Sequence, residues 1–141
     1  MPLPTHLTLE LVTPDHAVVH EQVDEIQLPG ASGYFGVLPG HTPLLAALDV
    51  GQLWYRRGQE KTYVSVAFGV AEVLPDRVIV MCRYAERAEE IDVARAETAK
   101  QRAQADLTKP AADIKDIERA RVAMIKAMTR LRVAETARRR R

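Results

Sequence analysis

The chain has 141 residues, of which 47% are apolar and 28% charged, and its net charge is +1 at pH 7. This composition is typical of a folded globular protein, and the length suffices for one domain or for a small domain with an appendage. A single cysteine, Cys82, excludes a disulfide framework and a cysteine-rich zinc site. The first residues have no basic region, and no stretch approaches the roughly 18 apolar residues of a membrane span, so we expect a soluble cytosolic protein without a signal peptide.

The composition of the chain changes near residue 85. All 7 glycines and all 7 aromatic residues precede residue 85, whereas residues 85–141 contain 14 alanines. Residues 1–84 carry 5 basic and 9 acidic groups, and residues 85–141 carry 15 basic and 10 acidic groups. Aromatic and turn-forming residues favour short strands, while alanine favours helices. The sequence therefore predicts a β domain at residues 1–85 and an α-helical domain at residues 86–141.

Short strands separated by turns are expected throughout the first domain. Leucines alternate with polar residues from position 7 to position 11, which is typical of a half-buried strand. Turn residues recur every 8 to 12 positions, and this spacing favours an all-β sandwich or barrel over βαβ units. We predict a β-sandwich of about ten short strands in which Cys82 is a buried apolar side chain. Further strands are expected at residues 17–23, 25–28, 52–57, 61–67, 70–74 and 78–82.

Two helices are expected in the second domain. Residues 86–107 contain neither glycine nor proline, and Pro110 ends this first helix. Asp113 is the expected N-cap of the second helix. The short connection predicts an antiparallel two-helix hairpin, and the apolar stripe of the first helix is mostly alanine, which buries little area. The residues are compatible both with a movable arm and with a statically packed hairpin. The apolar face expected on the second helix comprises Ile114, Ile117, Ala120, Met124, Met128 and Leu131.

Patterns of catalytic and metal-binding residues are missing from the sequence. The stretch Gly30–Gly36 lacks the Lys-Ser/Thr pair of a phosphate-binding loop, and its glycines are expected in turns with positive φ. His41 lies in a loop rich in proline and glycine, without a second ligand at metal spacing. There is no Gly-x-Ser-x-Gly and no His-Glu-x-x-His pattern. We therefore expect no catalytic residue, no metal and no required cofactor.

The second predicted helix is basic. Residues 113–141 contain 10 basic and 4 acidic groups. This charge predicts docking to an acidic partner surface. A nucleic-acid-binding module is the alternative function, although no aromatic residue lies between the basic ones to stack on bases.

Three segments together resemble the epsilon subunit of bacterial F-type ATP synthases. They are the loop Gly33–Leu45, followed by Leu48 and Gly51, the junction Ala85–Ala96, and Ala127–Ala134 late in the second helix. Their order and spacing extend over nearly the whole chain. The layout derived from composition, a β domain followed by a helical hairpin, agrees with the architecture of that family.

The resemblance implies a non-catalytic central-stalk subunit of the proton-translocating enzyme. Its implied role is to couple rotation between the c-ring and the gamma subunit, and to inhibit ATP hydrolysis through its C-terminal helices. The implied partners are the gamma subunit, the c-ring and the catalytic beta and alpha subunits, with no nucleic acid, and with the membrane reached only through the complex. The implied location is the cytoplasmic face of the bacterial inner membrane. Contact residues are expected in the loop and on the second helix, namely Tyr34, Phe35, Gly36, Pro39, Gly40, His41, Arg119, Arg121 and Arg132.

Some members of this family bind regulatory ATP through an Ile-Asp-x-x-Arg-Ala motif. Residues 91–96 match that motif completely. Lys126 stands where the ATP-binding members have arginine, and lysine lacks the bidentate geometry of a guanidinium group. The alternative is that Asp92 and Arg95 form an ion pair near a helix start. The nucleotide-binding residues that the resemblance implies are Glu86, Ile91, Asp92, Arg95, Ala96, Arg102, Lys126 and Arg130.

The chain departs from the family pattern at two places. Many members carry an acidic residue in the glycine-rich loop at the place where this chain has Tyr34 and Phe35. A charged contact to the c-ring is therefore not expected at this point. Many members also have a Gly-Gly pair in the strand after Ser65, where this chain has the sequence Val66–Gly69.

Overall fold

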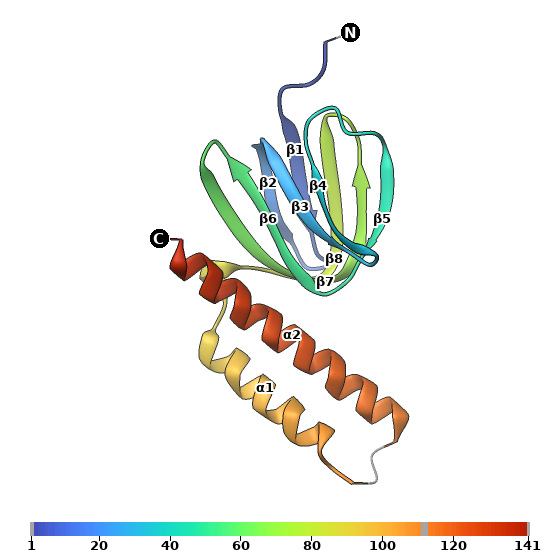
Figure 1. Ribbon diagram of the computed structural model, residues 1–141, viewed down its shortest axis with the longest axis vertical. Helices are drawn as coiled ribbons and strands as arrows, with labels where there is room; N and C mark the ends of the chain where they lie inside the picture. The colour runs from blue at the N-terminus through green and yellow to red at the C-terminus, as the bar shows by residue number, and fades with distance from the viewer. Residues whose placement is uncertain (1, 111–112, 141) are drawn as a thin grey trace. The chain divides into compact units, whose positions relative to one another are not determined.

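The computed structural model describes residues 2–110 and 113–140 (Figure 1). The chain divides into two compact units, a β unit of residues 1–87 and a helical unit of residues 88–141. This boundary lies two residues beyond the one expected from composition. Neither helix in the described part of the chain combines the length and the apolar character that crossing a bilayer requires.

The β unit is the expected sandwich, built from eight strands (Figure 1). The strands are paired in the order β2-β1-β8-β7-β5-β3-β4, and β6 pairs with β3 and β7. The pair β1–β8 is parallel and the other pairs are antiparallel. The bounds are β1 Leu7–Val12, β2 Ala17–Val23, β3 Glu25–Gly30, β4 Gly33–Val37, β5 Leu44–Leu48, β6 Gly51–Arg57, β7 Glu60–Val73 and β8 Arg77–Arg87.

The structure has eight strands rather than about ten, and two of the expected strands are one. Residues 61–67 and 70–74 were expected as separate strands, yet β7 runs from Glu60 to Val73 without a break. It pairs with β6 up to Val66 and with β5 from Gly69 onward. The chain therefore bends between Val66 and Gly69 while it remains hydrogen-bonded to β8 on its other side.

Alternating apolar side chains form the core of the β unit. Leu7, Leu9 and Leu11 are fully buried, as the alternation in the sequence predicted. Cys82 belongs to the same core, and burial raises the pKa of its thiol to about 12. The thiol is therefore protonated at neutral pH, and the prediction of a buried apolar side chain is confirmed.

The helical unit consists of a short 3-10 turn, η1 Ala88–Glu90, followed by α1 Val93–Leu107 and α2 Ile114–Arg139. The two helices pack side by side as an antiparallel hairpin (Figure 1). Asp113 caps α2 by accepting the Asp116 N–H at 2.8 Å, as predicted. Helix formation from residue 86 was a wrong prediction, because α1 begins only at Val93.

Residues 86 and 87 are held in strand β8 by two sets of hydrogen bonds. Glu86 pairs with Ser65, and Arg87 pairs with Val64, in the ladder between β8 and β7. The guanidinium group of Arg87 also donates from Nη2 to the Val18 carbonyl at 2.9 Å and from Nε at 3.3 Å. These contacts outweigh the helical propensity of the local sequence.

Small side chains form much of the buried surface of the hairpin. Ala96 and Ala103 are buried in α1, and Ala120 and Ala127 are buried in α2. Each pair has a seven-residue spacing, which returns a helix to nearly the same face. The apolar face expected on α2 was wrong in part, since 80% of Ile114 is exposed and Met128 is also exposed. Thr129 and Val133, which the periodicity did not select, are buried instead.

The close approach of β7 to β8 generates a prediction about stability. A Cβ atom on Gly69 would lie 2.1 Å from the main-chain oxygen of Met81, which only a backbone shift can relieve. We expect Gly69→Ala to lower the free energy of unfolding by about 1–3 kcal/mol. Gly36→Ala is the matched control, because a Cβ there would meet its nearest neighbour at 3.9 Å and φ at Gly36 is not positive. The control is expected to stay within about 1 kcal/mol of the wild type. Equal losses in urea unfolding of the two variants would contradict the prediction.

Candidate functional site: a partner-contact loop and a two-helix nucleotide site

The glycine-rich loop folds as a β-hairpin rather than as a phosphate-binding loop. Strands β3 and β4 are joined at Ala31 and Ser32, and residues 30 and 33 pair across the turn. Positive φ occurs at Gly33 and Gly40, as expected for turn glycines. Gly30 and Gly36 do not have positive φ, so the expectation was wrong for them. Gly30 is needed for close approach instead, because a Cβ there would lie 2.7 Å from the Gly33 oxygen.

The two aromatic residues of the loop have different environments. Tyr34 is 52% exposed, and its phenol oxygen accepts a hydrogen bond from the Gln52 N–H of β6 at 3.1 Å. Phe35 is partly buried and packs against the core. Of the two, Tyr34 therefore presents more of its ring to a partner, at a position fixed by its bond to β6.

The segment after β4 is held by main-chain hydrogen bonds. The Gly40 N–H donates to the Pro75 carbonyl at 2.8 Å, and the His41 N–H donates to the Leu38 carbonyl at 3.2 Å. The ring nitrogen Nδ1 of His41 lies 2.6 Å from the Thr42 oxygen. His41 is thus bonded within its own loop, and Pro39 and Gly40 are partly buried.

Three exposed leucines border this loop, and sequence reasoning did not select them. Leu38 is 54% exposed, Leu44 41% and Leu45 70%. Their signal in the sequence was three apolar side chains within a turn-rich segment, which was considered only as part of the loop Gly33–Leu45 that carries the resemblance. Exposed apolar groups of this kind gain free energy when a partner covers them.

The start of α1 contains the predicted nucleotide motif. The Asp92 carboxylate accepts the Arg95 N–H at 3.0 Å and so caps the helix. Asp92 and Arg95 are exposed, whereas Ile91 and Ala96 are buried. The contact between Asp92 and Arg95 is thus a capping hydrogen bond to the main chain. The carboxylate and the guanidinium group remain accessible to a ligand.

The hairpin brings the motif level with two cations of α2. Arg95 lies 12 residues before the end of α1 at Leu107, and Lys126 lies 12 residues after the start of α2 at Ile114. Equal distances from the connection give equal heights in antiparallel helices, because each residue advances the axis by about 1.5 Å. Arg130 lies one turn further on and is level with the helix cap at Asp92. Lys126 and Arg130 are both partly buried.

Two other predicted residues lie apart from this group. Arg102 is seven residues after Arg95 on α1, which corresponds to about 10 Å along the axis. Glu86 belongs to β8 and therefore to the β unit, whereas the expectation had placed it on the first helix. A cleft of about 550 Å³ between the helices lies at the opposite end of the hairpin and includes Lys109, Asp116 and Arg119.

The basic side chains of α2 differ in how far they are neutralised. Arg119, Arg121 and Arg132 are exposed, as docking to a partner requires. Arg121 Nε lies 3.7 Å from the Glu118 carboxylate. Near the end of the helix, Arg138 and Arg139 both bond to Glu135, and these bonds lower the pKa of that carboxyl. Among residues 2–110 and 113–140, no group of three or more His, Cys, Asp or Glu side chains is placed to hold a metal ion.

Both units match known protein families. Residues 6–88 match the family described as ATP synthase, Delta/Epsilon chain, beta-sandwich domain. Residues 89–135 match the family described as ATP synthase, Delta/Epsilon chain, long alpha-helix domain. The chain belongs to the delta/epsilon chain family of ATP synthases. The resemblance seen in the sequence motifs is thereby confirmed.

Curated relatives in this family are named as epsilon chains. The ATP synthase epsilon chain of Solibacter usitatus is 47% identical over 133 residues, which cover 94% of this chain and 98% of the relative. ATP synthase epsilon chain 2 of Syntrophotalea carbinolica is 47% identical over 128 residues, covering 91% and 93%. The expectation that this chain is a component of a larger complex, rather than an enzyme by itself, is confirmed by these matches.

Solved structures of ATP synthases contain the same fold. A chain in the Euglena gracilis mitochondrial ATP synthase, OSCP/F1/c-ring, has a TM-score of 0.81 and 25% identity, covering 92% of this chain and 81% of its own length. A chain in the central stalk/c-ring structure of the Tetrahymena thermophila mitochondrial enzyme has a TM-score of 0.57 and 12% identity, covering 96% and 98%. The latter likeness supports the fold alone.

The dual position of Asp92, as cap and as motif residue, generates a prediction. Asp92→Ala removes the cap of α1 and is expected to cost about 1 kcal/mol in the stability of the helical unit. Asp92→Asn keeps a good capping side chain and is expected to cost only a few tenths of that. Urea unfolding of the full chain, followed by far-ultraviolet circular dichroism, measures both. Equal destabilisation by the two substitutions would show that the charge, rather than the capping hydrogen bond, stabilises the helix start.

Proposed function

We propose that this chain is the epsilon subunit of the central stalk in a bacterial F-type ATP synthase and couples the c-ring and gamma subunit in rotation. One observation carries the proposal: the two family matches follow each other in order along the chain, and a named epsilon chain aligns over 98% of its own length. The implied partners are the gamma subunit, the c-ring and the catalytic alpha and beta subunits. The proposed location is the cytoplasmic face of the inner membrane, which the chain reaches through the complex.

The loop from Gly33 to Leu45 is the proposed contact with the c-ring or the gamma subunit. Its support is the presence of four exposed apolar side chains in this segment, at Tyr34, Leu38, Leu44 and Leu45. Because Tyr34 stands where many members have an acidic side chain, this contact is apolar rather than ionic.

Co-purification tests the proposal directly. An affinity-tagged chain, with a photo-reactive amino acid at the exposed position 45, is expressed in its own organism in place of the untagged chain. The expected result is recovery of the other ATP synthase subunits and a cross-link from position 45 to the c or gamma subunit. Recovery of nucleic acid without ATP synthase subunits would favour the alternative module based on the basic helix.

The helical unit is the proposed inhibitor of ATP hydrolysis. Its support is the exposed cations Arg119, Arg121 and Arg132 on α2, which suit an acidic surface on the catalytic subunits. The residues after position 110 are therefore proposed to act on the catalytic subunits, while the β unit keeps the chain in the complex.

Truncation after Pro110 is the corresponding test. We expect the truncated chain to assemble normally and the complex to hydrolyse ATP faster than the wild type. Removal of Arg140 and Arg141 alone is the control and is expected to change little, since chain ends contribute little to binding. Full assembly with an unchanged hydrolysis rate would argue against inhibition by this segment.

Regulatory ATP is proposed to bind between the two helices. Support comes from the complete motif at residues 91–96. Arg95 and Lys126 also lie at the same height along the axis of the hairpin. Cations at these positions suit the phosphates, and the exposed Asp92 carboxylate suits the hydroxyl or amino groups of the nucleoside. Arg130 and Arg102 supply further charge. A ligand that binds only when α1 and α2 pack against each other would favour that packed state. The concentration of the nucleotide would then control inhibition of ATP hydrolysis.

Calorimetric titration of the full chain with ATP tests this site. Heat is expected at or below millimolar ATP and is expected to be lost in Arg95→Ala, while Arg121→Ala serves as the control for loss of one positive charge. Lys126→Arg is expected to tighten binding by about tenfold or more, because a bidentate pair replaces a point contact. Absence of heat in the wild type, or unchanged binding in Arg95→Ala, would remove the site from these residues.

A further inference from the structure

The residues before β1 follow a defined path although they form neither strand nor helix. Pro2 and Pro4 each fix a φ angle in this segment, which leaves the chain fewer alternatives to that path. The segment lies at the same end of the β unit as the connection between β4 and β5 (Figure 1). Two contacts, one at His6 and one at Leu3, join it to residues that are distant in the sequence.

Asp24 holds the C-terminal end of this segment. The Nδ1 atom of His6 lies 3.1 Å from Oδ1 of the Asp24 carboxylate. The other carboxylate oxygen accepts the Gly58 N–H, in the turn between β6 and β7, at 2.6 Å. The Asp24 N–H donates to the Arg56 carbonyl of β6 at 2.8 Å. The bond from Gly58 and then the bond from His6 lower the pKa of Asp24, so His6 meets a charged acceptor whose position β6 and its turn determine.

Leu3 joins the same segment to the connection between β4 and β5. A Cβ atom on Gly40 would lie 3.3 Å from Cδ2 of Leu3. The leucine side chain therefore occupies the side of the main chain that the glycine leaves open. Leu3 is still 74% exposed, so this contact alone would hold the segment weakly. The bond between His6 and Asp24 supplies the second point of attachment.

One turn supports both the start of β1 and the connection that Leu3 touches. The Pro75 carbonyl, between β7 and β8, accepts the Gly40 N–H at 2.8 Å. The carbonyl of the next residue, Asp76, accepts the Thr8 N–H at 3.0 Å. The His41 N–H donates to the Leu38 carbonyl, which closes a turn at residues 38–41. A movement of residues 2–6 would thus act on this turn at Gly40.

From these contacts we infer that residues 2–6 form a strap, fastened at His6 by Asp24, that holds the turn at residues 38–41 in its conformation through Leu3. Asp24 acts on the turn through His6 and Leu3 and is therefore a positioning residue. The strap follows from contacts within the β unit. Its consequence for coupling rests on the proposed function, because residues 38–41 belong to the loop proposed as the contact with the c-ring or the gamma subunit.

Amide hydrogen exchange in the full chain, resolved by residue with NMR, tests the strap. Leu3→Ala removes the contact at the turn, and His6→Ala removes the attachment to Asp24. In both variants we expect the Gly40 and His41 amides to exchange about threefold faster or more, as loss of one hydrogen bond or one apolar contact allows. The matched control is His20→Ala, which removes another exposed histidine with a carboxylate neighbour, Glu10 at 3.7 Å, and is expected to leave this turn unchanged.

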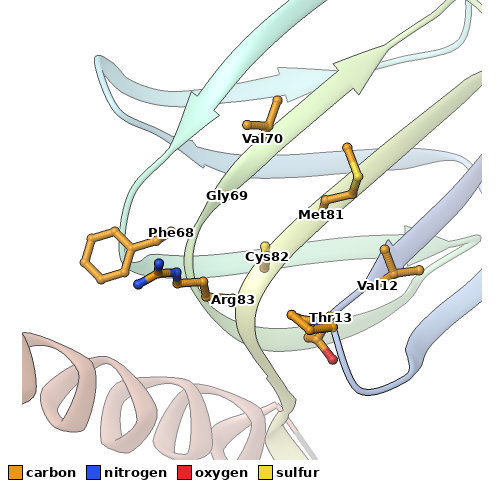
Figure 2. A pocket seen from close by; sticks show the side chains of 9 residues that line it. Val12, Thr13, Phe68, Gly69, Val70, Met81, Cys82 and Arg83 are labelled. Atoms are coloured by element: carbon orange, nitrogen blue, oxygen red, sulfur yellow. The ribbon is translucent and has the colours of Figure 1, made fainter.

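Reference amides and a rescue variant distinguish the strap from a general loss of stability. Gly69 and Cys82 pair across the same two strands, β7 and β8, away from the turn at Pro75 (Figure 2). Their amides are expected to keep their exchange rates in every variant. His6→Asn is expected to restore slow exchange at Gly40, because its side-chain amide can donate to the Asp24 carboxylate. A variant that combines Leu3→Ala with His6→Ala is expected to exchange no faster than the faster single variant, since both act through one strap.

The outcomes separate this inference from the proposed function. Unchanged exchange at Gly40 and His41 in both single variants overturns the inference. Equal acceleration at Gly40, Gly69 and Cys82 overturns it as well, because it would report a loss of stability throughout the β unit. These measurements use the chain alone and do not depend on its partners. The proposed function fails on a different result, the recovery of the tagged chain without ATP synthase subunits.

Discussion

Strand β7 hydrogen-bonds with β6, β5 and β8, and the positions of these three strands depend on its continuity. The strand must bend in order to pair with β6 along its first part and with β5 along its second part. The bend is possible only because Gly69, which has no side chain, lets the backbone of β7 approach that of β8. A side chain at position 69 would separate β7 from β8 and so disturb the core around Cys82. The same bend imposes left-handed backbone on Phe68 and turns its ring away from the core. A single steric constraint thus stabilises the sandwich and also fixes the backbone of a half-buried aromatic residue.

The two units are stabilised by different interactions. The β unit buries leucine, valine and isoleucine side chains, each worth about 1.5–3 kcal/mol when fully buried. The hairpin buries mainly alanines, which contribute much less, and its helices depend on the capping carboxylates of Asp92 and Asp113. Arg87 fixes the last residue of β8 to Val18, so the β unit stays ordered up to the boundary. The β unit, with its large apolar core, is thereby followed by a helical unit that buries little apolar surface.

Much of this architecture could be predicted from the sequence, because the alternating leucines of β1 and the helix cap at Asp113 are local signals. The long β7 could not, because Gly69 is locally typical of an interruption, whereas pairing with β8 on one side and with β6 and then β5 on the other keeps the strand continuous. The start of α1 was missed because ladder partners in β7, rather than local propensity, decide the state of residues 86 and 87. At the candidate site, the two expected helices carry Arg95 on α1 and Lys126 on α2. Leu45 was missed, since exposure depends on which face of a strand is covered.

The small buried surface of the hairpin determines how strongly a ligand can control it. A ligand that binds only one state stabilises that state by about 2.7 kcal/mol at a hundred times its dissociation constant. This value is similar to the free energy of burying one large apolar side chain, and the described part of α1 and α2 buries one valine, Val133, beside its alanines. A nucleotide bridging Arg95 and Lys126 would therefore change the stability of the hairpin by a large fraction. The same nucleotide would leave the leucine-rich core of the β unit unchanged.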